Sequence, residues 1–355
     1  MLDDVESRLA ELRGPVRPRR HNARTIAALT SNPGCKRRAV LDAAGIDKSA
    51  LATAVEFPAA YGQSQFAITR GNAFEARMKA DGCAELLQLL RDTLGLDLPD
   101  DVTYTDLDDV GDDQDLRHAH ARTHLTSPDG GAALYDHPLL KLRVGGQDVF
   151  LEPDLVAFQH DGRYHVVEIK SFPVIDRQAD PAKVAAAATQ AAVYVLALRR
   201  LLGDPAAVAH EIVLVCPADF GSRPVAVKVD VRRQLSVLEH QLARMVRVDR
   251  ILAELPTDLT FRLDLNRSAG ELGAAVGAVE PCYSPSCLSS CELAFFCRHE
   301  GRRSTASLGT NVREDLGGVE TIDEVLAIAE GADDGSEVAA MIRNVARVYA
   351  ESRAT

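Results

Sequence analysis

The sequence LEPDLVAFQHDGRYHVVEIKSF, at Leu151–Phe172, predicts the centre of a β-sheet. It is typical of two β-strands, Val149–Phe158 and Arg163–Lys170. They are joined at His160-Asp161-Gly162, where Asp-Gly is a strong signal for a tight hairpin turn. We therefore expect two neighbouring antiparallel strands at the core of the fold.

Charged side chains should gather on one face of this hairpin. Side chains alternate along a strand, so Glu168 and Lys170 point one way while Val167 and Ile169 point into a core. Asp154, on the neighbouring strand, can lie beside Glu168. The pattern predicts two carboxylates and one ammonium on the same sheet face.

Two carboxylates beside an ammonium have a chemical use. Carboxylate oxygens are hard ligands that suit Mg²⁺ or Mn²⁺, and such an ion can activate water and neutralise charge on a phosphate. A lysine can orient that water or stabilise the developing charge. The alternative is an exposed salt bridge, because Glu-x-Lys alone is common on solvated sheets. The Pro153-Asp154 placement, the hairpin spacing and the apolar flanks favour the metal site.

Composition limits the class of protein. The 355 residues are 46% hydrophobic, which is ample for one large core with appended modules. The chain has no run of about eighteen apolar residues and begins with an amphipathic, acidic helix pattern rather than a signal peptide, so we expect a cytoplasmic protein without a membrane span. A net charge of −12 excludes a general polyanion binder, so any nucleic-acid contact must be local.

Residues 71–92 predict a helix that breaks near Gly82. Asn72 is its expected N-cap, which makes Glu75 a capping-box partner three residues later. The alternative, which the residues leave open, is that Glu75 is a third acidic metal ligand.

The acidic insert at residues 95–137 is interpreted as a solvated loop, although His118, His120 and His124 offer a second, less favoured metal site. The remaining elements alternate between strands and helices, and they predict an α/β fold. Gln190 and Tyr194 share one helix face, with Tyr194 either a core aromatic or a functional group. The elements are a strand at Leu139–Val144, a helix at Pro181–Leu202, strands at Glu211–Pro217 and Val225–Val231, and a helix at Arg232–Leu255.

Basic side chains form short clusters near the N-terminus. Cys35-Lys36-Arg37-Arg38 opens a predicted helix at Lys36–Ala44. Arg37 and Arg38 are either a solvated face or an edge that contacts phosphates. Together with Arg298, Arg302 and Arg303 they can form a local DNA-facing edge.

Four of the seven cysteines lie within residues 282–297. Such density in a cytosolic protein indicates a metal, either Zn²⁺ in a Cys₄ site or an iron–sulfur cluster, rather than disulfides or unrelated buried thiols. Spacing alone does not choose between these metals. It also leaves Cys282 and the distant Cys35 as rival fourth ligands beside Cys287, Cys291 and Cys297.

These pieces together resemble a family. The chain resembles the RecB-like branch of the PD-(D/E)xK nucleases, specifically the members with an iron–sulfur cluster, such as CRISPR-associated exonucleases and the AddB nuclease domain. The matching pieces occur in family order over roughly residues 35–300. They are Gly71-x3-Glu75, Pro153-Asp154, Glu168-Ile169-Lys170, Gln190-x3-Tyr194, and one early cysteine with three late ones.

The resemblance implies a role for each matched residue. Glu75, Asp154, Glu168 and the Ile169 carbonyl would bind the metal, and Lys170 would be catalytic. Gln190 and Tyr194 would position the DNA strand or the active site, and Cys35, Cys287, Cys291 and Cys297 would hold a [4Fe-4S] cluster. Two features depart from the family pattern: many members have histidine where Glu75 stands, and the cysteine triplet has three residues between its first two members instead of two.

The resemblance also implies a restriction-endonuclease-like core, a mixed sheet flanked by helices, with a helical subdomain stapled by the cluster. We divide the chain into an N-terminal helical segment (1–60), a nuclease core with the acidic insert (61–255), a cluster segment (256–303) and a C-terminal helical module (304–355). The expected function is a metal-dependent DNA nuclease acting on single-stranded or end-bearing DNA, with proteins of a repair or phage-defence complex as partners. The alternative is a non-catalytic or redox-responsive binding module on the same fold.

Overall fold

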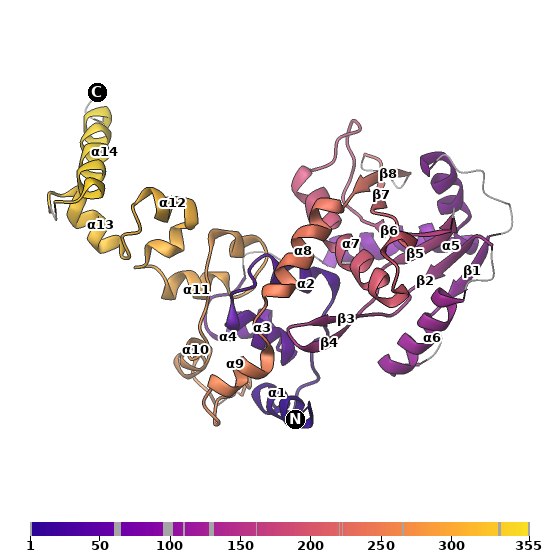
Figure 1. The fold of residues 1–355 in the computed structure, drawn as a ribbon, viewed down its shortest axis with the longest axis horizontal. Coiled ribbons are helices and arrows are strands. Elements are labelled where there is room, and N and C mark those ends of the chain that lie inside the picture. Colours follow the sequence, from indigo (N-terminus) through magenta and orange to yellow (C-terminus); the bar gives the residue numbers. More distant parts are fainter. Residues whose placement is uncertain are drawn as a thin grey trace.

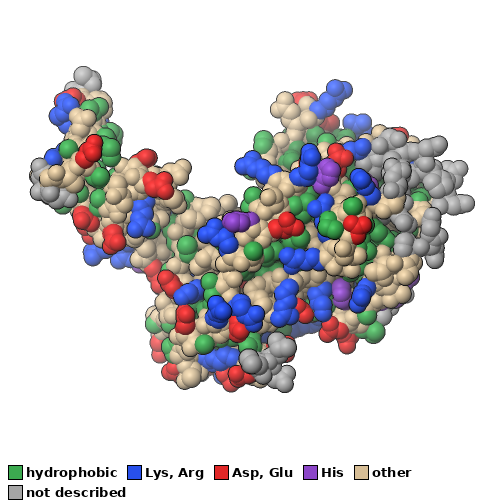
Figure 2. Space-filling view, viewed as in Figure 1, with side chains coloured by type: hydrophobic (Ala, Val, Ile, Leu, Met, Phe, Trp, Pro, Cys, Tyr) green, Lys and Arg blue, Asp and Glu red, His purple; other side chains and the backbone are tan. Residues whose placement is uncertain are grey.

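The computed structural model describes residues 2–59, 65–94, 102–108, 111–127, 131–160, 162–219, 221, 223–264, 266–332 and 335–353. Its centre is a six-stranded sheet with helices on both faces (Figure 1). On the face seen in Figure 2, Lys and Arg side chains gather over the central body, with acidic side chains between them.

The six-stranded sheet is mixed, with the order β1-β2-β5-β6-β7-β8. The pairs β1–β2 and β6–β7 are parallel, and the other neighbours are antiparallel. The predicted α/β class is therefore confirmed. The strands are β1 (Thr103–Asp106), β2 (Ala133–Asp136), β5 (Leu155–His160), β6 (Arg163–Ile169), β7 (Glu211–Pro217) and β8 (Pro224–Asp230).

Helix α7 (Pro181–Leu202) covers one face of the sheet, as predicted. It begins where the Asp180 side chain accepts the first free N–H groups and ends at Gly203, whose φ of 72° suits a left-handed cap. Ten of its residues are buried, and they pack in one cluster with alternate strand residues such as Val166 and Leu214. By length and composition α7 could cross a membrane, but a buried core helix passes the same test.

Helix α5 (Gln65–Leu94) covers the opposite face. Its apolar side chains pack against the other alternate residues of the sheet, including Val167 and Ile169. The predicted break near Gly82 is confirmed, because Ala80–Cys83 leave helical geometry. The predicted N-cap at Asn72 is wrong, because the helix begins at Gln65 and Glu75 lies well inside it.

The predicted strand Val149–Phe158 is wrong, because two strands stand there. β4 (Gln147–Leu151) pairs with β3 (Leu140–Val144) in a separate two-stranded sheet, and β5 begins only at Leu155. The break falls at Pro153, which has no N–H to donate to a ladder. Asp161, in the predicted turn, lies outside the described residues.

Two other predictions needed correction. The insert at residues 95–137 contains β1, β2 and α6 (Gln114–Thr126), which is capped by the Asp113 carboxylate, so the interpretation as a solvated loop is wrong. The predicted helix Arg232–Leu255 is two helices, α8 (Arg232–Arg244) and α9 (Val248–Glu254). The chain is extended at Met245, and the Val248 N–H donates to the Gly145 carbonyl of the β3–β4 turn.

The N-terminal helices pack against the cysteine segment. Backbone bonds join chain regions about 250 residues apart: Phe261 N–H donates to Leu12, and Arg37 N–H donates to Glu280. The elements on the two sides are α1 (Leu2–Arg13), α2 (Ala23–Thr30), α3 (Lys36–Ala43) and α4 (Lys48–Ala54), and α10 (Ala269–Gly277) and α11 (Ala294–Glu300).

The C-terminal tail projects from the main body (Figure 1). It holds α12 (Thr310–Asp315), α13 (Ile322–Ala329) and α14 (Glu337–Arg353), and a small core of its own around Ile328, Ala339 and Ile342. Helix α13 begins at a side-chain cap, where the Thr321 side chain accepts the Glu324 N–H.

Candidate active site and cysteine segment

The predicted acidic pair, Asp154 and Glu168, lies where β5 begins and β6 ends. The strands are antiparallel with Leu155 opposite Val167, which brings Asp154 beside the end of β6. Asp154 Oδ2 accepts the Ile169 N–H at 3.1 Å. The Lys170 ammonium lies 2.5 Å from Glu168 Oε2 and 3.4 Å from Asp154 Oδ2. The expected convergence of Asp154, Glu168 and Lys170 is therefore present.

Glu168 is the most unusual group in this site. It shares the α7-facing side with Val166, and none of its surface is exposed. No donor in the described part of the chain other than the Lys170 ammonium contacts its carboxylate oxygens. Burial raises the pKa of Glu168 to about 7, and the negative charges of Asp154 and Glu75 add to the rise while Lys170 opposes it.

For Lys170, neighbouring charges have more effect on the pKa than burial has. Burial alone would lower the pKa of this ammonium, but Glu168 and Asp154 outweigh that effect and raise it above its ordinary value. The lysine therefore carries its charge at neutral pH.

Helix α7 contributes Gln190 and Tyr194 to the same side of the sheet. The Tyr194 hydroxyl donates to the Glu152 carbonyl at 3.1 Å, just before Pro153. Burial, with the charge of Glu168 nearby, raises the pKa of Tyr194, and a hydrogen bond with Gln190 opposes the rise. Tyr194 is thus the core aromatic that one reading predicted, and it also supports the backbone that carries Asp154. A direct contact of Gln190 and Tyr194 with DNA stays a prediction.

Glu75 belongs to a neighbouring cluster. Its Oε1 lies 2.6 Å from the Lys79 ammonium, one helical turn on, and the same ammonium lies 2.9 Å from Asp136 Oδ1. Lys79 is also 3.0 Å from His137 Nε2. Among the described residues, the carboxylates of Glu75, Asp154 and Glu168 do not form a set with ligand atoms within 4.8 Å of one another.

The sequence analysis did not identify three residues near Glu75 and Lys79 that form a possible metal site. Asp106, Asp136 and His137 have ligand atoms within 4.8 Å of one another, and Tyr104 donates to Asp136 at 2.7 Å. The available signal was Asp136-His137 at the end of the buried strand β2. The parallel pairing of β1 with β2, which brings in Asp106, has no signature in the sequence.

The cysteine segment packs directly on Cys35, which is buried and precedes α3 without making a capping hydrogen bond. The Asn32 side chain donates to the Cys282 carbonyl and lies 3.5 Å from Cys287 Sγ. Cys35 is close enough to Cys282, Cys291 and Cys297 to raise the pKa of each thiol, although burial is the larger cause. Both candidates for the fourth ligand therefore lie at this place.

The positions of the cysteine sulfurs can be compared with the geometry of a zinc site. A tetrahedral zinc site with bonds near 2.3 Å needs its sulfurs about 3.8 Å apart. Among the described cysteines, no three sulfurs lie within 4.8 Å of one another. Burial raises the pKa of Cys291 to about 11 and of Cys297 to about 12, so these thiols need a metal to become thiolates at neutral pH. The choice between zinc and an iron–sulfur cluster therefore stays a prediction.

The prediction of an exposed edge at Arg37 and Arg38 is wrong. Both side chains are buried, with 2% and 5% of their surface exposed. Arg37 donates to the Val279 carbonyl and to Cys297 Sγ at 3.1 Å, and it pairs with Glu300. Arg38 pairs with Asp42 at 3.2 Å. These guanidinium groups join the two ends of the chain instead of facing solvent.

No family model and no curated protein matches the chain. A solved structure titled "Crystal structure of SSO0001" matches at 12% identity and a TM-score of 0.28, covering 69% of this chain and 87% of that one. That similarity is too low to carry an argument, so the site has to be interpreted from its own geometry.

Proposed function

We propose that this protein is a metal-dependent deoxyribonuclease that hydrolyses phosphodiester bonds of single-stranded or end-bearing DNA. The observation that carries the proposal is the fully buried Glu168 carboxylate, held beside Asp154 and Lys170 at the end of a central strand. A buried carboxylate with a raised pKa costs stability, and such costs concentrate at functional sites.

The residues fit a hard divalent cation. Asp154 and Glu168 would hold Mg²⁺ or Mn²⁺ with the Ile169 carbonyl, and Glu75 would join only by leaving its ion pair with Lys79. When bound, the cation supplies a Lewis acid and lowers the pKa of its water. Lys170 already contacts both carboxylates, so its ammonium is placed to orient an attacking water and to stabilise charge on the phosphate.

The cysteines would hold a [4Fe-4S] cluster with a structural role. Cys35 would supply one ligand from the N-terminal helices, and Cys287, Cys291 and Cys297 would supply the others. The Arg37 contact with Cys297 supports negative sulfur at this place. Bonds between such distant parts of a chain constrain the unfolded state strongly.

One observation favours a second function, a non-catalytic or redox-responsive binding module. The carboxylates already contact protein cations, one for each pair: Lys170 contacts Asp154 and Glu168, and Lys79 contacts Glu75 and Asp136. A site compensated in this way can stand without a metal.

Mn²⁺ titration by calorimetry, beside cleavage of end-labelled single- and double-stranded DNA by anaerobically purified protein, distinguishes the two functions. Asp154→Ala and Glu168→Ala should lose both site-specific Mn²⁺ binding and cleavage. Lys170→Ala should retain Mn²⁺ but lose cleavage by orders of magnitude, because the ligands remain. Glu239→Gln, on the exposed side of α8, is the matched control. Cleavage at the wild-type rate by folded Asp154→Ala and Lys170→Ala would leave the binding module as the function.

A further inference from the structure

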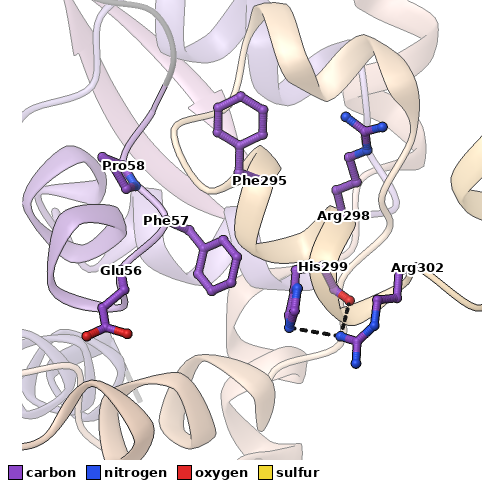
Figure 3. A pocket seen from close by; sticks show the side chains of 7 residues that line it. All are labelled: Glu56, Phe57, Pro58, Phe295, Arg298, His299 and Arg302. Carbon is purple, nitrogen blue, oxygen red and sulfur yellow. Dashed lines mark hydrogen bonds between the residues drawn. The ribbon is translucent and has the colours of Figure 1, made fainter.

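An open cavity of about 420 Å³ lies between α11 and the segment that follows α4 (Figure 3). Its size falls within the range of ligand sites in proteins. It has no place in the proposed cleavage site. Its walls include Glu56, Phe57, Phe295, Arg298, His299 and Arg302.

Aromatic rings form part of the wall. The Phe57 ring packs against Phe296 at 5.7 Å and against the His299 ring at 4.9 Å, so these rings are fixed by their neighbours. Phe295, which is partly exposed, lies on another part of the wall (Figure 3). The cavity therefore offers flat apolar surface that remains accessible to solvent.

The same wall is basic. Arg298 and Arg302 are exposed, and within the described residues no carboxylate pairs with either guanidinium. Arg302 donates to His299 Nε2 at 2.8 Å and to the His299 carbonyl at 3.0 Å, which holds its side chain beside the cavity. Among the described residues of the wall, Glu56 is the single acidic one.

A simpler explanation covers only part of this arrangement. Cations are favourable at the C-terminal end of a helix, which accounts for Arg298 in the last turn of α11. It does not account for Arg302, which lies beyond the helix, or for accessible rings in the same cavity. Accessible rings beside guanidinium groups that no described carboxylate pairs with are the combination that binds single-stranded nucleic acids, where bases stack and phosphates pair with arginine.

We propose that this cavity binds a nucleotide unit of single-stranded DNA, with the base against Phe295 and the phosphate at Arg298 and Arg302. The proposal rests on the proposed function and adds a DNA-holding site apart from the cleavage site. An acidic peptide would use the guanidinium groups but leave the ring surfaces without a partner, so the nucleotide fits the whole wall.

Fluorescence anisotropy with a short labelled oligothymidylate, in EDTA to prevent cleavage, tests the full-length protein. Phe295→Ala should weaken binding roughly 5- to 150-fold, the range for loss of one base–aromatic stack. Arg298→Gln and Arg302→Gln should each weaken binding and reduce the salt dependence by about one released counterion. Tyr349→Ala and Arg200→Gln, exposed residues of α14 and α7, are the matched controls and should bind as the wild type does.

Three results would overturn the proposal. The first is wild-type affinity in Phe295→Ala and in both arginine variants. The second is equal affinity for an abasic oligomer, which would remove the stacking contact. The third is competition by polyglutamate as effective as competition by unlabelled oligothymidylate, which would make the site one for acidic peptides. Mn²⁺ binding at Asp154 and Glu168, measured on the same preparations, tests the cleavage site separately, so either proposal can fail alone.

Discussion

In metal-free protein, Glu168→Gln should increase stability. Glutamine has nearly the shape of glutamic acid but never ionises. The pKa of Glu168 is raised from 4.5 to about 7 by burial. At neutral pH, ionisation of Glu168 therefore stabilises the unfolded chain more than it stabilises the folded protein. One pKa unit corresponds to about 1.36 kcal/mol, so the ionisation free energy of Glu168 differs between the unfolded and folded states by about 3 kcal/mol at pH 7. Removing the ionisable group should therefore raise the free energy of unfolding by about 3 kcal/mol.

The pH dependence gives this expectation a definite sign. Because the folded-state pKa of Glu168 is raised, wild-type protein recovers stability as the pH falls from about 7 towards 4.5. The advantage of Glu168→Gln should shrink over the same window and vanish near its lower end. Adding Mn²⁺ at about 1,000 times the Kd should reverse the order at pH 7, because binding then stabilises wild type by about 4.1 kcal/mol and the variant lacks a ligand.

Urea unfolding followed by circular dichroism, in EDTA and then in Mn²⁺ across this pH range, measures both effects. Glu239→Gln should change stability by less than about 0.5 kcal/mol, as exposed substitutions usually do. If Glu168→Gln is less stable than wild type in EDTA at pH 7, the ion pair with Lys170 outweighs the cost of burial and the reasoning is refuted.

Other expectations follow from the buried charges and the cysteines. Asp42→Ala should destabilise the protein by about 3–5 kcal/mol, because it leaves Lys48 and Arg38 buried without their carboxylate. Burial opposes ionisation of Asp42, but Lys48 and Arg38 outweigh it and lower the pKa of Asp42 below 3.8. The contribution of Asp42 to stability is therefore present at neutral pH and lost as the pH falls below 3.8. Urea unfolding at neutral pH and below pH 3.8 checks this, and equal stability of variant and wild type at neutral pH would contradict it. Anaerobic wild type should contain about four irons per chain and be brown; Cys35→Ser should bleach it and Cys282→Ser should not, as iron analysis and visible absorption would show. A colourless protein with one zinc would contradict the iron expectation, and loss of colour in Cys282→Ser alone would move the fourth ligand there.

Local signals predicted the elements that hold the site. Period-two alternation placed Glu168 and Lys170 on one face of β6, and the structure shows their ion pair. The predicted helix Pro181–Leu202 has the bounds of α7, whose ends are set by residues next to it in the sequence, Asp180 and Gly203. The resemblance to a nuclease family added roles for these residues, and those roles stay predictions.

What the sequence could not show depends on long-range packing. Arg37 and Arg38 looked like a solvated edge because nothing nearby in the sequence predicts Glu300 and the Val279 carbonyl as partners of Arg37, or the Ser290 carbonyl as a partner of Arg38. Glu75 looked like a capping residue because the helix start at Gln65 has no clear local signal. Asp136, which shares the Lys79 ammonium with Glu75, lies on a strand about sixty residues away, and only the tertiary fold brings the two carboxylates within reach of Lys79.

The charges buried around the cysteines support the proposal of a metal group bound by thiolates. Arg37, Arg38 and Lys48 are all more than 90% buried, and Asp42 is the one carboxylate among the described residues that is buried to the same degree beside them. Partly exposed Glu300 and Glu292 bring the carboxylates to three, equal to the three cations, but of these carboxylates only Asp42 is buried as deeply as the cations. Buried charges are costly unless they are compensated. Thiolates around a metal group would bring negative charge to the Arg37 and Arg38 side of the cysteines, which gives these arginines a reason to be buried that DNA contact does not.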